Sequence, residues 1–98
     1  MNFVEQIVNF NQEVLGIEQR VQSLIPANEA QISIESLVEE ANELREAFTE
    51  KDFIKAVDAV ADTLFFGVGV LYKFGLTSNQ ITNAILSQYN GRLQHPMS

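Results

Sequence analysis

The spacing of apolar residues along the chain predicts helices from one end to the other and no strand. Apolar positions recur at helical intervals over residues 3–15. They follow Asn2, a favourable capping residue, and precede Gly16, which favours the end of a helix. Over residues 17–32 the pattern weakens and Pro26 interrupts it. There we expect a short helix followed by a loop.

A second helix is predicted from Ser33, a good N-cap, to about Phe48. The helical period places one set of apolar residues on a common face, which we expect to be its core face. That face consists of Ile34, Leu37, Ala41, Leu44 and Phe48.

The most apolar segment lies between Asp52 and Gly75, and it predicts a third helix buried by neighbours on all sides. Either Thr49 or Asp52 is its cap, and Gly75 is placed for a left-handed C-terminal residue. The short connection over residues 49–52 makes the second and third helices antiparallel neighbours. A chain of 98 residues has too few companions to cover such a helix, so we expect a homodimer or homotetramer.

Thr77 and Gln80 have the spacing of a capping box, which opens a fourth helix running to about Tyr89. Residues 92–98 are predicted to form a disordered tail. The expected architecture is therefore a single all-α domain over residues 1–98, a bundle of four main helices completed by oligomerisation.

Composition narrows the class of protein. The chain has 13 acidic and 6 basic residues and a formal charge of −7, which argues against a surface for duplex nucleic acid. Cysteine is absent, so no thiolate site or thiol nucleophile is present. The uncharged run over residues 63–72 is too short for a membrane span, and residues 1–14 lack the pattern of a signal peptide. We expect a cytoplasmic protein without a membrane partner.

Two pairs of carboxylates stand out against the apolar helices. Asp58 and Asp62, four residues apart, share one face of the third helix, and Glu40 and Glu43 lie at the edge of the core face of the second. Because these helices are expected to be antiparallel neighbours, the four side chains could converge. Oxygen ligands without histidine or cysteine select a hard cation, Mg²⁺ or Mn²⁺.

Simpler interpretations exist for several of these acids. Acidic residues on a helix usually form a solvated face, and this interpretation suits Glu35, Glu39, Glu46 and Glu50. Asp58 could instead form a structural ion pair with Lys55 or Arg45. Asp62 has apolar neighbours on both sides and is the hardest to explain without a cation.

The acidic motifs also carry a family resemblance. Glu39-Glu40-Ala41-Asn42-Glu43 resembles the Glu-Glu-x-x-Glu motif of the MazG-like, all-α nucleoside triphosphate pyrophosphohydrolases. Asp58-Ala-Val-Ala-Asp62-Thr-Leu-Phe-Phe resembles the second metal motif of that family, and the likeness covers residues 33–76. The second motif departs from the usual Glu-x-x-Asp, because Ala59 occupies the Glu position and Asp58 stands one residue earlier.

The resemblance implies roles for the acidic residues. Glu40, Glu43 and Asp62 match metal ligands, and Asp58 is expected to substitute for the missing fourth. Glu39 matches a glutamate that is either a further ligand or the group that orients the attacking water.

The resemblance also suggests substrate-binding residues. Asn90 and Arg92 are similar to the family's asparagine and following basic residue near the substrate phosphates, although a helix-end Asn-Gly with a solvent-facing arginine explains them equally well. Lys55, Lys73 and Arg92 are the candidates to attract a polyphosphate to an acidic protein. The alternative for each of them is an ordinary surface charge without a role in binding. Aromatic residues of the bundle are candidates for base stacking, namely Phe10, Phe65, Phe66 and Tyr72.

The activity implied by the resemblance is Mg²⁺-dependent hydrolysis of a nucleoside triphosphate between the α and β phosphates, which yields a monophosphate and pyrophosphate. Carboxylate-held Mg²⁺ can clamp phosphate oxygens and activate water, which agrees with that chemistry. Two alternatives stay open. One is phosphoribosyl-ATP pyrophosphohydrolase, from a related helical group, and the other is a non-enzymatic helical dimer with a remnant acidic site.

Overall fold

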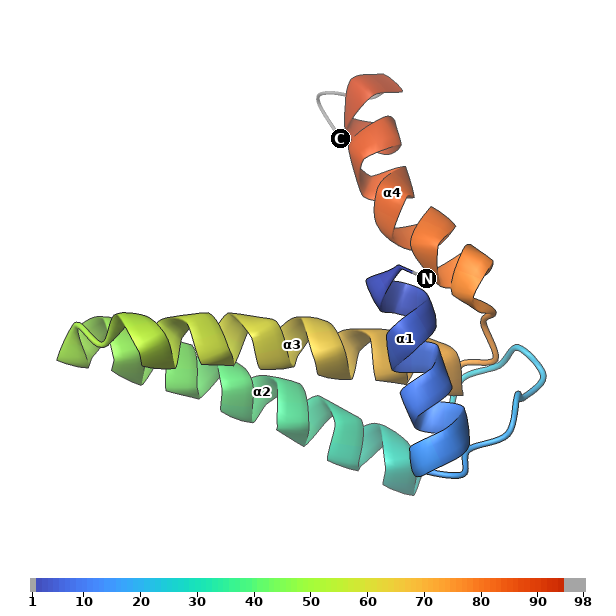
Figure 1. Ribbon diagram of the computed structural model, residues 1–98, viewed down its shortest axis with the longest axis horizontal. Coiled ribbons are helices and arrows are strands. Elements are labelled where there is room, and N and C mark those ends of the chain that lie inside the picture. The colour runs from blue at the N-terminus through green and yellow to red at the C-terminus, as the bar shows by residue number, and fades with distance from the viewer. Residues whose placement is uncertain (1, 95–98) are drawn as a thin grey trace.

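The computed structural model describes the backbone of residues 2–94 and the side chains of residues 2–89. Over that range it contains helices and no strand, which confirms the all-α prediction. The helices are α1 (Phe3–Asn9), α2 (Ala27–Glu50), α3 (Phe53–Lys73) and α4 (Ser78–Gln94), and a π-helical turn, η1 (Phe10–Val14), extends α1. Helices α2 and α3 form a long antiparallel hairpin, α1 crosses its open end, and α4 projects away from it (Figure 1).

Two predicted helix starts are confirmed by their caps. The Asn2 side chain accepts a hydrogen bond from the backbone N–H of Glu5 at 2.8 Å. At the start of α4, the Thr77 hydroxyl accepts from the Gln80 N–H at 3.3 Å and the Gln80 side chain accepts from the Thr77 N–H at 2.9 Å. These bonds satisfy backbone donors that have no partner within their own helix.

The turn between α2 and α3 is as short as predicted. Lys51 adopts a left-handed conformation with φ of 57°, and the Asp52 N–H donates to the carbonyl of Ala47 at 2.9 Å. Asp52, rather than Thr49, caps α3, because its carboxylate accepts from the Lys55 N–H at 3.0 Å. This turn makes α2 and α3 antiparallel neighbours.

The prediction for residues 17–32 is wrong. No helix forms between Leu15 and Pro26, and α2 begins at Ala27, six residues before the expected start at Ser33. Pro26 begins the helix rather than interrupting a previous one, since proline needs no N–H partner at a helix start. The preceding loop is held by tertiary bonds, among them Tyr72 Oη to the Ile17 carbonyl at 2.7 Å.

The predicted core face of α2 is also wrong within one chain. Ile34 and Phe48 are 61% and 74% exposed, whereas the buried residues of α2 are Ser33, Glu40 and Ala47. The stripe of α2 that contains Glu40 and Ala47 therefore faces α3. The small side chains of Ala47 and Ala59, each 1% exposed, allow the two helices to approach closely along this stripe.

The hydrophobic core lies where α1, the end of α3 and the start of α4 meet. It is built on Val4, Val8, Val68, Tyr72 and Ile81. Toward the hairpin turn, the apolar residues of α3 are largely exposed, so the expected burial of α3 on all sides is not met within one chain. These exposed residues include Phe53, Ile54, Val57, Val60 and Leu64.

Gly75 ends α3 with φ of +90°, as predicted for a left-handed terminal residue. A Cβ at this position would lie 2.6 Å from the backbone of Val21 and 2.7 Å from the carbonyl of Arg20. We therefore expect Gly75→Ala to destabilise the fold by about 2 kcal/mol or more, which lowers Tm by roughly 10 °C. Thermal unfolding followed by circular dichroism measures this.

Gly67→Ala is the matched control, because a Cβ there meets nothing within 4 Å. In a helix interior this change should leave stability unchanged or raise it by about 0.5–1 kcal/mol. Equal Tm values for the two variants would contradict the role assigned to Gly75.

Helix α4 continues through Gly91 to Gln94, beyond its expected end near Tyr89, so three residues assigned to the tail are helical. Residues 95–98, the rest of that predicted tail, lie outside the described residues. Among the helices described here, none is long and apolar enough to cross a membrane.

Candidate metal centre

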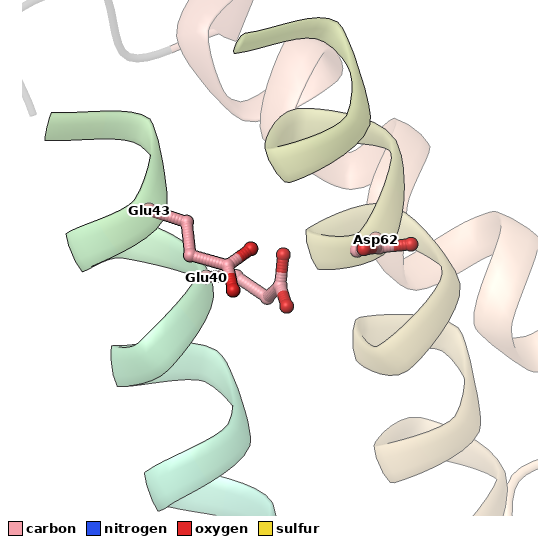
Figure 2. Close-up of side chains that lie close together, drawn as sticks. All are labelled: Glu40, Glu43 and Asp62. Carbon is pink, nitrogen blue, oxygen red and sulfur yellow. The ribbon is translucent and has the colours of Figure 1, made fainter. Parts of the chain in front are cut away.

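Three carboxylates from two helices meet at the middle of the hairpin. Glu40 and Glu43 extend from α2 toward α3, and Asp62 lies opposite them on α3 (Figure 2). One oxygen from each side chain lies within 4.8 Å of the others. The convergence expected from the sequence is therefore present for three of its four members.

The backbone explains why these residues meet. Residues three apart on a helix lie on one face, so Glu40 and Glu43 both belong to the stripe of α2 that packs on α3. Both helices are fixed by the tight turn at Lys51 and Asp52, which sets the register of the hairpin. The position of Asp62 opposite the pair follows from that register.

Glu40 carries the clearest electrostatic signal. Glu40 is only 7% exposed, and among the described residues its buried Oε2 has no hydrogen-bond partner. Burial raises the pKa of Glu40, and the nearby carboxylates of Glu43 and Asp62 raise that pKa further. A buried carboxylate facing two others is unfavourable unless it is protonated or a cation is bound.

These residues fit a divalent cation. The donor set consists of carboxylate oxygens, one of them buried and unpartnered, and such ligands suit Mg²⁺ or Mn²⁺. Half-buried Glu43 and exposed Asp62 leave the outer side of the group open to water and to a ligand.

Asp58 and Glu39 are not part of this group. Asp58 is exposed one turn before Asp62, and Glu39 is exposed beside Glu40. The alternative pairing of Asp58 with Lys55 does not form. The Lys55 ammonium instead contacts Glu46 at 3.1 Å and Glu50 at 3.2 Å.

The basic residues proposed for substrate lie at different places. The hydrogen bonds that Lys55 donates to Glu46 and Glu50 raise the pKa of its ammonium, so this group is engaged near the hairpin turn. Lys73 is half-buried at the other end of α3 and lines a cleft. The side chains of Asn90 and Arg92 lie outside the described residues, so their predicted roles stay predictions.

The cleft lined by Lys73 has a volume of about 370 Å³ and runs along α2 and α3 next to the carboxylates. Ser36 lines it one turn before Glu40, and Phe65 lines it one turn after Asp62. Phe10 and Phe66, two further candidates for base stacking, also line it. Tyr72 does not, because it is fully buried and its hydroxyl is bonded to the loop.

The sequence interpretation missed Asn11 in this cleft. Asn11 is 3% exposed and lines the cleft from η1. One signal was available, because Val4, Val8 and Asn11 follow the i, i+4, i+7 pattern of a buried stripe, in which a polar residue is out of place.

Comparison with known proteins agrees with this site. Residues 13–88 match the family model described as phosphoribosyl-ATP pyrophosphohydrolase, and this range contains both acidic motifs. The protein is thus an all-α pyrophosphohydrolase. More specifically, the chain belongs to the phosphoribosyl-ATP pyrophosphohydrolase family, the related group named above as an alternative to the MazG-like enzymes. No curated protein and no solved structure matches the chain significantly.

The raised pKa of Glu40 predicts a pH dependence of the metal-free protein. Between the ordinary pKa of 4.5 and the raised value, the folded state binds more protons than the unfolded state. The free energy of unfolding should therefore fall as pH rises through this window. Glu40→Gln removes the titration, so its stability relative to the wild type should increase with pH.

Urea unfolding in metal-free buffer from about pH 4 to 8 tests this dependence. Glu35→Gln, on the outward side of α2, is the control and should follow the wild type. A stability difference between Glu40→Gln and the wild type that is the same at every pH would contradict the prediction.

Proposed function

We propose that the protein hydrolyses a nucleoside triphosphate between the α and β phosphates, releasing a nucleoside monophosphate and pyrophosphate with Mg²⁺ as cofactor. The observation that carries this proposal is the convergence of Glu40, Glu43 and Asp62, in which the buried Oε2 of Glu40 has no hydrogen-bond partner in the part of the chain that the structure describes. The family match supports the pyrophosphohydrolase class.

In this proposal Glu40, Glu43 and Asp62 hold the cation. The bound metal would neutralise charge on the phosphate oxygens and lower the pKa of water. The hairpin keeps the three carboxylates in place, because each stands on a helix fixed by the turn and the α2–α3 contact. Asp58, one turn from Asp62, is the candidate fourth ligand on the open side.

Glu39 is proposed to orient the attacking water, or else to serve as a further ligand. As the water oxygen bonds to phosphorus, the α–β anhydride P–O bond breaks and the water proton passes to a carboxylate. Exposed Glu39, next to Glu40 in sequence, is the carboxylate that we assign to this step. No side-chain nucleophile is required.

The cleft beside the carboxylates is proposed to take the nucleoside. Its volume of about 370 Å³ falls within the range of small-molecule sites, about 300–1,000 Å³. Lys73 at its far end is a candidate contact for substrate. Asn90 and Arg92 on α4 are further candidates for contact with the phosphates.

A second candidate substrate is phosphoribosyl-ATP, which the family description favours. The same phosphoanhydride bond would be cleaved, so the carboxylate chemistry does not separate the two. The test is a panel of ribonucleoside and deoxyribonucleoside triphosphates together with phosphoribosyl-ATP, assayed for pyrophosphate release with Mg²⁺. Release from one or more of these substrates is expected.

Two controls make this assay decisive. Release should require divalent metal and should be lost in Glu40→Gln, while Glu35→Gln should retain it. Release of inorganic phosphate in place of pyrophosphate, or no release from the whole panel, would contradict the proposed activity. The remnant-site alternative predicts no release and weak or no Mn²⁺ binding in calorimetry.

We also propose that the active form is a homodimer or a dimer of dimers. The radius of gyration is 15.1 Å, against about 13 Å for a compact chain of this length. An apolar groove along the α2–α3 hairpin is lined by Leu44, Phe48, Ala56, Val57, Val60, Ala61 and Leu64. A second copy offers the same apolar residues, so it can cover them.

Light scattering at micromolar concentration should show a dimer or tetramer. Val60→Asp places a charge in the groove and should shift the protein toward monomer. Asn83→Asp, which adds the same charge on an exposed position of α4, should leave the assembly unchanged. A well-folded monomeric wild type would contradict the proposal.

A further inference from the structure

Asn11 is the most deeply buried of the polar residues that line the cleft, and neither metal binding nor hydrolysis uses it. It lies in the π-helical turn η1, is 3% exposed, and contributes its side chain to the cleft wall. A π-helical turn within a helix often marks a functional position. Asn11 also precedes residues 13–88, so the family match does not cover it.

The orientation of the Asn11 amide is fixed by one hydrogen bond. Its Nδ2 donates to the carbonyl of Ile7 at 2.9 Å. Because a carbonyl can only accept, the nitrogen must lie on that side and Oδ1 on the other. Oδ1 lies next to Gly69, where an added Cβ would stand 3.5 Å from it, and both residues line the cleft.

The amide lies at a suitable distance from the carboxylates for a base. It rests against Gly69, which follows Asp62 by seven residues, about 10 Å along α3. Between these positions the cleft is walled by Phe65, whose ring packs edge-on against Phe10 with a centroid separation of 5.3 Å. Phosphates at the carboxylates would therefore place the sugar and base between the metal centre and Asn11.

We propose that Asn11 is a specificity-determining residue of this site, whose Oδ1 accepts a hydrogen bond from the exocyclic amino group of the substrate base. The inference rests on the proposed hydrolysis of a nucleotide at Glu40, Glu43 and Asp62. It names the substrate class as nucleotides whose base carries an amino group beside an unprotonated ring nitrogen on its Watson–Crick edge, adenine or cytosine.

The donor and acceptor pattern explains the selection. The second N–H of Asn11 stays available for the unprotonated ring nitrogen beside the amino group on the Watson–Crick edge of adenine or cytosine. Hypoxanthine and uracil present a carbonyl and a ring N–H at the same edge, so acceptor would face acceptor and donor would face donor. The Ile7 carbonyl opposes rotation of the amide to suit them.

The test measures binding of four nucleotides whose α–β bridging oxygen is replaced by methylene, the analogues of ATP, ITP, CTP and UTP. Each pair, ATP with ITP and CTP with UTP, differs by amino against carbonyl. Calorimetry with Mg²⁺ and wild-type protein should show the amino member of at least one pair binding about tenfold to a hundredfold more tightly. The pair with the larger ratio identifies the base. Equal affinities within both pairs, or no binding of any analogue, would overturn the proposal.

Asn11→Leu keeps the approximate size of the side chain and removes both polar atoms. If Asn11 reads the base, the affinity ratio within the preferred pair should fall to about one. A purely structural role would weaken all four analogues equally and preserve the ratio, which would overturn the proposal.

Gly69→Ala tests the same contact with Asn11 left in place. The added Cβ would lie 3.5 Å from Oδ1, an ordinary contact that the fold can tolerate, and would fill space beside the amide. The preferred analogue should bind about fivefold to tenfold more weakly, because its edge is displaced from the amide. Gly67→Ala, two residues away with open space around the new Cβ, should bind as the wild type does. Equal binding by the two glycine variants would count against the proposed position of the base.

Pyrophosphate release from the natural nucleotides, measured in parallel, separates this inference from the proposed activity. Release without base preference would overturn the role of Asn11 and leave the hydrolysis standing. Base preference in binding without any release would support the role of Asn11 and contradict the proposed hydrolysis.

Discussion

Asp62→Asn should lower kcat/KM for pyrophosphate release by roughly a hundredfold to a thousandfold while the helical fold is retained. Asparagine keeps the shape of the side chain and one oxygen, but it removes the charge that faces Glu40 and Glu43. A weaker hold on the cation reduces charge stabilisation in the transition state. Initial rates with Mg²⁺ give kcat/KM, and far-ultraviolet circular dichroism reports the fold.

The same substitution should leave the metal-free protein as stable as the wild type, or more so. Without a cation, the three carboxylates repel one another, and burial adds to the strain at Glu40. Removing one charge relieves that repulsion. Glu35→Gln, which removes an outward charge from α2, should retain full activity. An unfolded Asp62→Asn variant would show instead that Asp62 belongs to a structural ion pair.

Divalent metal should raise the melting temperature by ten degrees or more. The ligands come from α2 and α3, so the unfolded chain has no assembled site and binds the cation weakly. At a hundredfold excess over Kd, mass action stabilises the folded state by about 2.7 kcal/mol. For a domain of this size each kcal/mol shifts Tm by roughly 4–8 °C.

Thermal unfolding in MgCl₂ or MnCl₂, compared with NaCl at equal ionic strength, checks this result. NaCl should have a much smaller effect, because it only screens the carboxylates. Glu40→Gln or Glu43→Gln should remove most of the difference between the salts. Equal rises of Tm in NaCl and MgCl₂ would mean that the carboxylates form a surface screened by salt, which would contradict the proposed metal centre.

Several features of this protein could be predicted from the sequence because they depend on local chemistry. The caps at Asn2 and Thr77, the tight turn at Asp52 and the end of α3 at Gly75 all form as predicted. Each depends on bonds or backbone angles within a few residues, so tertiary context has little to change. The pairing of Glu40 with Glu43 belongs to this group, because a spacing of three on a helix places both on one face.

The roles of residues that depend on contacts between distant segments could not be predicted in this way. Periodicity identified the apolar face of α2 but not what covers it, and α3 packs instead on the stripe of Glu40 and Ala47. Pro26 was interpreted as an interruption, although the loop before it is held by Tyr72, far along the chain.

Apart from the first residues of α2, the sequence by itself determined the four main helices, their order and the acidic motifs, because these follow from spacing and capping within single segments. The tertiary structure decided that Asp62 meets Glu40 and Glu43 while Asp58 stays outside their group, and that Asn11 lines the neighbouring cleft. Both facts depend on the register of the hairpin and the crossing of α1. Those are set by packing between segments distant in sequence, which no local pattern encodes.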